Sequence, residues 1–201
     1  CDSQNIIESK SFKLFLNSLN QSKFKSTQDL SSILTKDLSR CADGHVHVNI
    51  FESCSEYPKN TIHSNGKCID GMDIKVDDYV FNPSILKESS CQNNLVTETL
   101  SSHLLKSNCL VTNQPDWGSV FIKYKGGKID EEKLLRYIIS FRLHNEFHEQ
   151  CVERIFNDIN NYCVPEHLSV FARYTRRGGL DINPFRSNFE NNSEIGRLIR
   201  Q

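Results

Sequence analysis

The sequence predicts an α+β fold made of two tandem modules of antiparallel strands and paired helices, with the first module incomplete. Three observations favour it. The second half runs in the order strands, two helices, strands; the first half repeats the later part of that order; and a polar segment, 87–94, separates the two halves. We therefore expect modules at 1–86 and 95–201, in a chain that is truncated on its N-terminal side.

The second module shows strand and helix patterns in sequence order. Segment 117–127 alternates apolar and polar residues and ends in Gly-Gly, which is typical of a hairpin strand. Asp130 is a suitable cap for a first helix, and a second helix ends before Pro165. Strands are predicted at 167–177 and around 180–185. The apolar residues at helical spacing are Leu134, Leu135, Ile138, Ile139, Val152, Ile155, Phe156 and Ile159.

The first module shows helix patterns followed by strand patterns. Segments 11–24 and 26–41 are helix-like, and the second opens with a Ser-Thr cap. The alternating segment 45–53 and the apolar segment 78–83 are predicted to be strands. The opening strands of this module are missing from the pattern, so we expect an unpaired sheet edge there.

Composition narrows the possible functions. The 24 Lys and Arg residues nearly balance the 25 Asp and Glu residues, which disfavours nucleic acid or a membrane surface as a direct partner. No signal peptide or long apolar run is present, so a cytoplasmic protein is expected. Eight cysteines without a CxxC pair indicate reduced thiols, and Cys151 and Cys163 are expected to be buried in helices.

Three short segments carry candidate chemistry: ESKSFKLF at 8–15, CLVTNQPD at 109–116 and FHEQC at 147–151. Taken singly, these residues have ordinary interpretations. Cys109 could be a buried thiol, Asp116 a turn residue, and Glu149 an exposed helical carboxylate. The density of polar and turn-forming residues around Cys109 nevertheless favours a nucleophile over a simple strand position.

Together the three segments resemble the NADPH-dependent 7-cyano-7-deazaguanine reductases, the nitrile reductases of queuosine biosynthesis, in their two-module form. The E-S-K-S-F-K run of residues 8–13 carries the most specific part of the resemblance. It implies the tunnelling fold shared with GTP cyclohydrolases, a homodimer, and 7-cyano-7-deazaguanine as the small-molecule substrate. Family members of this form begin with a longer N-terminal segment, in keeping with the expected truncation.

The resemblance also implies roles for individual residues. Cys109 would add to the nitrile carbon and form a thioimide, Asp116 would supply a proton if burial keeps its carboxyl partly protonated, and His148 would assist proton transfer. The implied substrate contacts are Ile7, Glu8, Ser9, Phe147, His148 and Glu149, in which the Glu149 carboxylate accepts two N–H groups of the deazaguanine ring. A substrate site built from both modules is expected.

The cofactor implied by the resemblance is NADPH, consumed twice for each amine formed. No GxGxxG follows a strand, so a Rossmann domain is excluded. The implied cofactor contacts are Ser9, Lys10, Lys13, Arg176, Arg177 and Gly178, in which lysines and arginines would meet phosphates and a glycine would allow close backbone approach.

Two rival functions remain open at the level of sequence. His144, His148 and Cys151 share one helical face and could ligate zinc, although Asn145 breaks the metalloprotease pattern. A cyclohydrolase-like zinc site that uses Cys109 is a related possibility. The other rival is a non-catalytic purine-binding module.

Overall fold

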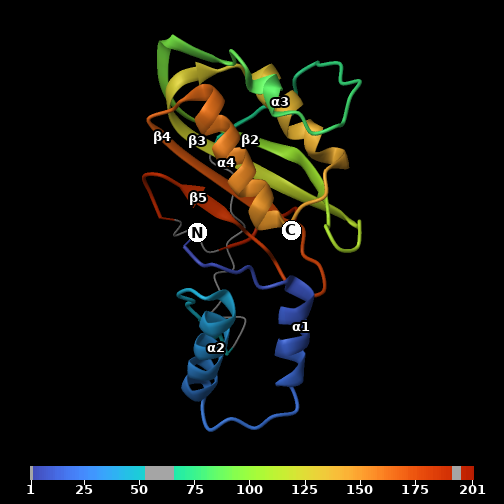
Figure 1. The fold of residues 1–201 in the computed structure, drawn as a ribbon, viewed down its shortest axis with the longest axis vertical. Coiled ribbons are helices and arrows are strands. Elements are labelled where there is room, and N and C mark those ends of the chain that lie inside the picture. Colours follow the sequence, from blue (N-terminus) through green and yellow to red (C-terminus); the bar gives the residue numbers. More distant parts are fainter. Residues whose placement is uncertain (1, 53–65, 192–195) are drawn as a thin grey trace. The chain divides into compact units, whose positions relative to one another are not determined.

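The computed structural model describes residues 2–52, 66–191 and 196–201 (Figure 1). The chain forms two compact units: residues 1–59 with 178–180, and residues 60–177 with 181–201. Residues 66–86, which the sequence places in the first module, therefore belong to the second compact unit. That the two units are copies of one module stays a prediction.

The described residues of the first unit form two helices, α1 (Ser9–Ser18) and α2 (Thr27–Ala42). The side chain of Ser26 caps α2 by accepting a hydrogen bond from the Asp29 backbone N–H, as the sequence predicts. Helix α1 ends at Ser18, six residues before the predicted end at 24. Beyond it, the backbone N–H groups of Leu19, Asn20 and Ser22 each bond three residues back, which tightens the chain into turns. Within α2, residues Leu34, Leu38 and Ala42 are buried.

The strand predicted at 45–53 does not form over its described residues, 45–52; Ser53 lies outside them. Backbone groups of this segment bond to side chains of α2 instead: the Val46 N–H donates to Ser39 Oγ, and the Val48 carbonyl accepts from Ser31 Oγ. An alternating pattern becomes a strand only where a neighbouring strand offers its backbone groups. The prediction of a strand from the alternating apolar and polar residues was therefore wrong for 45–52.

The second unit contains a five-stranded sheet with strand order β1-β2-β3-β4-β5. β1 pairs with β2 in parallel, and the other pairs are antiparallel. The strands are β1 (Lys67–Cys68), β2 (Ser90–Asn108), β3 (Pro115–Ile129), β4 (His167–Tyr174) and β5 (Phe185–Ser187). The helices are α3 (Glu131–Ile139) and α4 (His148–Cys163), with short 3₁₀ helices η1 (Pro83–Leu86) and η2 (Ser140–Leu143).

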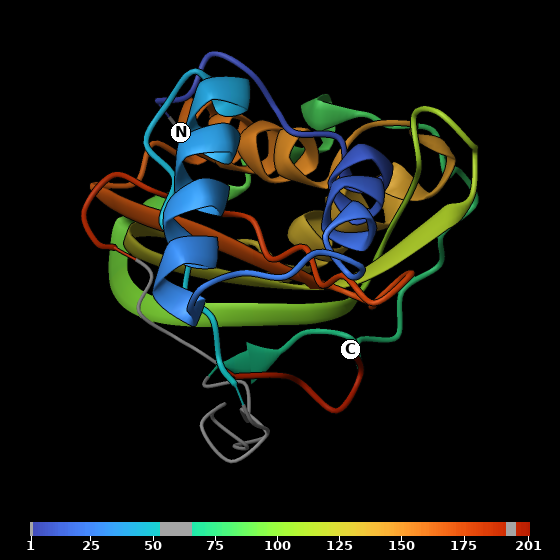
Figure 2. The ribbon, with the colours of Figure 1, turned by 90° about the horizontal axis from the view of Figure 1, so that it is seen from below.

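Helices α3 and α4 pack on one face of this sheet (Figures 1 and 2). Every apolar residue predicted for these helices is buried, as are Cys151 and Cys163. Asp130 caps α3, since its carboxylate accepts from the Lys133 N–H. The predicted α+β class and the order of strands, two helices and strands in the second half are confirmed.

Other boundaries differ from the prediction. Segment 78–83 is not a strand: Phe81 packs on Tyr137 and Phe141, and the chain then enters η1. Residues 90–94 of the predicted linker are part of β2. The pair Gly126–Gly127 lies inside β3 rather than at a turn.

Gly126 and Gly127 of β3 allow close approach of other backbone. A Cβ at Gly126 would lie 2.9 Å from Pro165 Cα, and one at Gly127 would lie 2.9 Å from the Cys91 carbonyl oxygen. In the part of the chain that the structure describes, no helix is long and apolar enough to cross a membrane.

Candidate active site

Cys109 lies directly after β2, at the start of the tight turn that leads into β3. Its backbone N–H donates to the Gln114 carbonyl at 2.8 Å, and its carbonyl accepts from the Asn113 N–H at 2.9 Å. Asn113 has a φ of 56°, a left-handed conformation that asparagine tolerates better than most residues. The turn-forming residues of the segment therefore hold Cys109 in the turn of the β2–β3 hairpin, with its side chain buried.

The turn also activates the thiol. Burial raises the pKa of Cys109, but hydrogen bonds from the Thr112 side chain, from the backbone N–H groups of Thr112 and Val111, and from Arg177 together lower this pKa from 9.0 to about 7. Backbone N–H groups that converge on one atom favour its anionic form. The lowered pKa favours the thiolate, the nucleophilic form of cysteine, so the residue is suited to nucleophilic attack.

Asp116 lies near the start of β3 and is 6% exposed. Its Oδ1 lies 3.0 Å from Nη1 of Arg177, and its Oδ2 lies 3.4 Å from Nε2 of His148. Arg177 Nη1 also donates to the Gln114 side-chain oxygen at 3.1 Å. A buried carboxylate, an imidazole and a guanidinium thus converge beside the thiol, an arrangement that can move a proton and stabilise negative charge.

His148 is the first residue of α4, and its ring is fixed on two sides. Besides the Asp116 contact, the ring meets that of Tyr174 edge-on, with centroids 4.1 Å apart. Tyr174 is buried at the end of β4. Burial raises the pKa of Tyr174 well above 10, so this side chain stays neutral. Among the described residues, the polar partner of the His148 ring is the Asp116 carboxylate.

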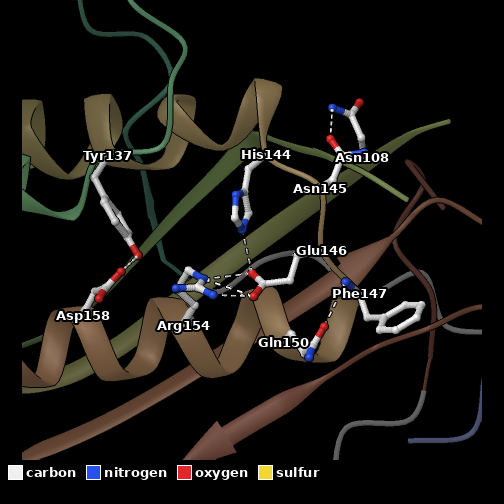
Figure 3. Close-up of polar contacts among 9 residues, drawn as sticks. All are labelled: Asn108, Tyr137, His144, Asn145, Glu146, Phe147, Gln150, Arg154 and Asp158. Atoms are coloured by element: carbon white, nitrogen blue, oxygen red, sulfur yellow. Dashed lines mark hydrogen bonds and ion pairs between the residues drawn. The ribbon is translucent and has the colours of Figure 1, made fainter. Parts of the chain in front are cut away.

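The loop before α4 is attached to the end of β2 (Figure 3). The Asn108 N–H donates to the His144 carbonyl at 2.8 Å, and the Glu146 N–H donates to the Asn108 carbonyl at 3.1 Å. The Asn145 amide donates to the side-chain oxygen of Asn113 at 2.9 Å, within the cysteine turn. These bonds fix the start of α4, and with it His148, relative to the turn that carries Cys109.

Glu146, a residue of the same loop, connects the loop to α4, as Figure 3 shows. Its two carboxylate oxygens accept from Arg154 Nε and Nη2 of α4 at 2.6–3.2 Å, and Oε2 lies 3.0 Å from His144 Nε2. Burial raises the pKa of Glu146, but the hydrogen bonds from Arg154 and His144 outweigh it and lower the pKa below 4.5. The carboxylate is therefore ionised at neutral pH and holds the loop.

The predicted substrate residues Phe147 and Glu149 flank His148. Phe147 is the N-cap residue of α4, and its N–H donates to the Gln150 side chain at 3.4 Å. Glu149 lies in the first helical turn, half-buried. Among the described residues, no hydrogen bond or ion pair of Glu149 is found, so both its oxygens are available to a ligand.

The predicted residues of the first unit gather at the start of α1. Glu8 is the N-cap: its carboxylate accepts from the Lys10 and Ser11 backbone N–H groups at 3.0 and 2.8 Å. The hydrogen bond from Lys10 is the main reason that the pKa of Glu8 is lowered. Ile7 precedes this cap, and Ser9 is the first residue of the helix.

The predicted cofactor residues are divided between the two compact units. Lys10 and Lys13 are exposed on α1, and Arg176 is exposed after β4. Gly178, which the contacts place in the first unit, has a φ of 63°, and a Cβ there would lie 2.8 Å from Lys13 Nζ. The backbone conformation favours glycine here, whereas the ammonium group ends a flexible side chain that can move aside. An exposed ammonium beside a bare backbone suits a phosphate group.

Cys109 does not join a metal-ligand cluster among the described residues, and neither do His144, His148 and Cys151. Sequence reasoning missed four supporting residues: Thr112, Asn145, Glu146 and Arg154. Thr112, Glu146 and Arg154 have partners only two to eight residues away, whereas the partners of Asn145 are more than 30 residues away. Only their neighbourhood to the named segments would have indicated them.

The fold and the site together define an α+β protein that presents an activated cysteine beside a carboxylate and a histidine. Two family descriptions match the chain: "Nitrile reductase, 7-cyano-7-deazaguanine-reductase N-term" over residues 1–50, and "QueF-like protein" over residues 115–193. Together they cover more than half of the sequence. The chain belongs to the QueF family of 7-cyano-7-deazaguanine nitrile reductases.

Among solved structures, the chain is similar to one described as the archaeosine synthase QueF-Like in the apo form. The two sequences are 16% identical, and the similarity covers 49% of this chain and 97% of the other, with a TM-score of 0.42. The family membership supports nitrile reduction in queuosine biosynthesis.

Proposed function

We propose that the protein reduces the nitrile of 7-cyano-7-deazaguanine to the primary amine with two equivalents of NADPH, through a thioimide on Cys109. The observation that carries this proposal is the thiol with a pKa of about 7 beside the contact between Asp116 and His148. A nitrile carbon is a weak hydride acceptor, whereas a thioimide has a C=N bond open to attack, so covalent addition solves the chemical problem.

In the first step, the Cys109 sulfur bonds to the nitrile carbon, and one π bond of the nitrile becomes an N–H bond. The proton lost by the thiol must reach that nitrogen. Asp116 is the group that we propose carries it, because its carboxylate faces both Arg177 and His148. Arg177 also favours the thiolate before attack. The first step thus uses only side chains of one compact unit.

NADPH, when bound, supplies the hydride ion for each of the two reductions. After the first, the carbon–sulfur bond breaks, Cys109 recovers its proton, and the substrate becomes an imine. The second reduction gives the amine, with protons delivered to nitrogen by the Asp116 and His148 pair. We propose Ser9, Lys10, Lys13, Arg176, Arg177 and Gly178 as the residues that hold the cofactor.

Glu149 is proposed as the anchor of the heterocycle, because its carboxylate has no competing partner among the described residues and can accept two adjacent N–H groups. Phe147 and His148 would contact the ring from the same turn. Ile7, Glu8 and Ser9 stay predicted substrate contacts of the first unit. The homodimer and the absence of a nucleic-acid partner are likewise proposals.

The test is mass spectrometry of the protein mixed with 7-cyano-7-deazaguanine without cofactor. We expect a mass increase equal to the whole substrate, since addition expels no leaving group, and we expect it on the Cys109 peptide. Cys109→Ala should lose both the adduct and NADPH oxidation, while Cys91→Ala, which removes an exposed thiol of β2, should keep both. An adduct that persists in Cys109→Ala would exclude Cys109 as the nucleophile.

A further inference from the structure

The sheet of the second unit carries a second group of chemically active side chains, none of which takes part in the proposed reaction. Cys68 lies on β1, Asp70 follows that strand, and His103 lies on β2. One ligand atom of each lies within 4.8 Å of the others. We propose that these three side chains bind a zinc ion that fastens β1 to β2, with water as the fourth ligand.

A bulge in β2 places the histidine and the carboxylate together. β2 has one extra residue between Ser102 and Leu105 relative to β3, and a bulge of this kind redirects side chains and frees backbone groups. The freed His103 N–H donates to Asp70 Oδ2 at 2.8 Å, and Ser102 Oγ donates to Oδ1 at 2.6 Å. Each oxygen keeps a lone pair for a metal.

The His103 ring is oriented by a partner on the next strand. Its Nδ1 lies 2.7 Å from Ser119 Oγ of β3. A hydrogen bond at one ring nitrogen fixes the tautomer and leaves the other nitrogen for a metal, which is the usual arrangement around metal-bound histidines. This contact distinguishes His103 from a histidine that merely fills space in the sheet.

The set of ligands selects the metal. A thiol, an imidazole and a carboxylate suit Zn²⁺, whereas Mg²⁺ and Ca²⁺ prefer oxygen ligands throughout. Zinc holds such ligands at about 2.0–2.3 Å, so bound ligand atoms lie roughly 4 Å or less apart. The side chains must close by about 1–1.5 Å, and Cys68, which is exposed, can supply this by rotation.

The position suggests what the ion does. β1 is only two residues long, and it pairs with β2 at Leu100 and Ser101 alone. Ile69 adds one backbone bond to Ser101 and is buried in the core. A metal shared by residues 68, 70 and 103 would close the chain at the edge of the sheet and hold the buried Ile69 in place.

The experiment uses the full chain and Co²⁺, which replaces Zn²⁺ and gives a visible absorption and a thiolate charge-transfer band. We expect one Co²⁺ per chain, with a thiolate band that added Zn²⁺ abolishes. Cys68→Ser should lose the thiolate band, and His103→Ala should weaken binding at least tenfold. The controls Cys91→Ser and Cys109→Ala should both retain the thiolate band, since neither cysteine belongs to the group.

A second readout does not depend on cobalt. A ligand that binds only the folded state raises the melting temperature, so Zn²⁺ should raise that of the unchanged protein and of Cys91→Ser but not that of Cys68→Ser. Because Cys68 is exposed, its replacement should leave the fold intact without metal. A thiolate band that survives in Cys68→Ser, or no stoichiometric metal in the unchanged protein, would overturn the proposal.

Discussion

At the scale of single residues, the activity proposed for this protein depends on the pKa that the turn after β2 gives to the Cys109 thiol. Burial alone would keep the Cys109 thiol neutral. Two backbone N–H groups, the Thr112 hydroxyl and Arg177 reverse this effect and bring the pKa to about 7. The turn is therefore part of the chemistry, and its residues are not interchangeable loop positions.

The Thr112→Val substitution tests this role. Because the Thr112 hydroxyl stabilises the thiolate, its loss should raise the Cys109 pKa from about 7 toward the ordinary value of 9.0. Alkylation of the Cys109 peptide by iodoacetamide, followed by mass spectrometry, should increase through a midpoint near pH 7 in the unchanged protein and through a higher midpoint in the variant. Thr97→Val, at an exposed position of β2, is the control and should leave the midpoint unchanged. A midpoint in Thr112→Val equal to that of the control would contradict the assignment.

Glu149 is the residue whose removal should affect binding more than chemistry. Replacing it by Ala leaves two ring N–H donors of the substrate unpaired, which should weaken binding by about 1.5–3 kcal/mol. Isothermal calorimetry with 7-cyano-7-deazaguanine in the Cys109→Ala background measures this without reaction. Asn157→Ala, at an exposed position of the same helix, is the matched control. Equal affinities of the two variants would place the anchor elsewhere.

At the scale of elements, the loop between η2 and α4 decides whether the site exists. It is bonded to Asn108 at the end of β2, to Asn113 in the cysteine turn, and through Glu146 to Arg154 on α4. The end of β2, the cysteine turn and the start of α4 are thereby held together by this loop, a junction called the corner below (Figure 3). The histidine and the cysteine come from different elements, so their separation depends on this corner.

The Glu146→Gln substitution should loosen that corner. Loss of a charged acceptor that is 8% exposed should lower the free energy of unfolding by about 1.5–3 kcal/mol at pH 7. The folded-state pKa of Glu146 is lowered, so its stabilisation is present above pH 4.5 and is lost as the pH falls through the folded-state value. Urea unfolding across this range should show the difference between variant and unchanged protein shrinking with acid. Glu132→Gln, which affects a surface pair with Arg136, should cost less than about 1 kcal/mol. A pH-independent difference would show that the charge of Glu146 is not what stabilises the corner.

At the scale of the whole molecule, the two compact units differ in how much they bury. The second unit has a continuous core between its sheet and helices α3 and α4. In the first unit, α2 buries Leu34, Leu38 and Ala42, whereas α1 buries no residue fully. Local stability follows the buried apolar area, so the helices of the first unit should open more readily.

Hydrogen exchange followed by mass spectrometry measures this difference directly. Amides of α1 should exchange at least about tenfold faster than those of β3 and α4, because few buried contacts oppose their opening. Peptides from α2 should be intermediate, and the exposed segment 77–80 provides a fast-exchanging internal reference. Equal protection of α1 and β3 would mean that the first unit is stabilised by more than its own core.

The sequence by itself determined the α+β class, the two helices of the second half with their buried faces, and the residue types of the reactive cluster. Local patterns sufficed there, because helical spacing and caps such as Asp130 and Ser26 act between residues close in the chain. The tertiary structure alone decided that 45–52 is not a strand, that 67–86 packs with the second unit, and that Asn145 and Glu146 hold the site. Each of these depends on partners distant in sequence: a strand needs a neighbour for its backbone groups, and the pKa of Cys109 depends on Arg177, which only folding brings to the cysteine turn.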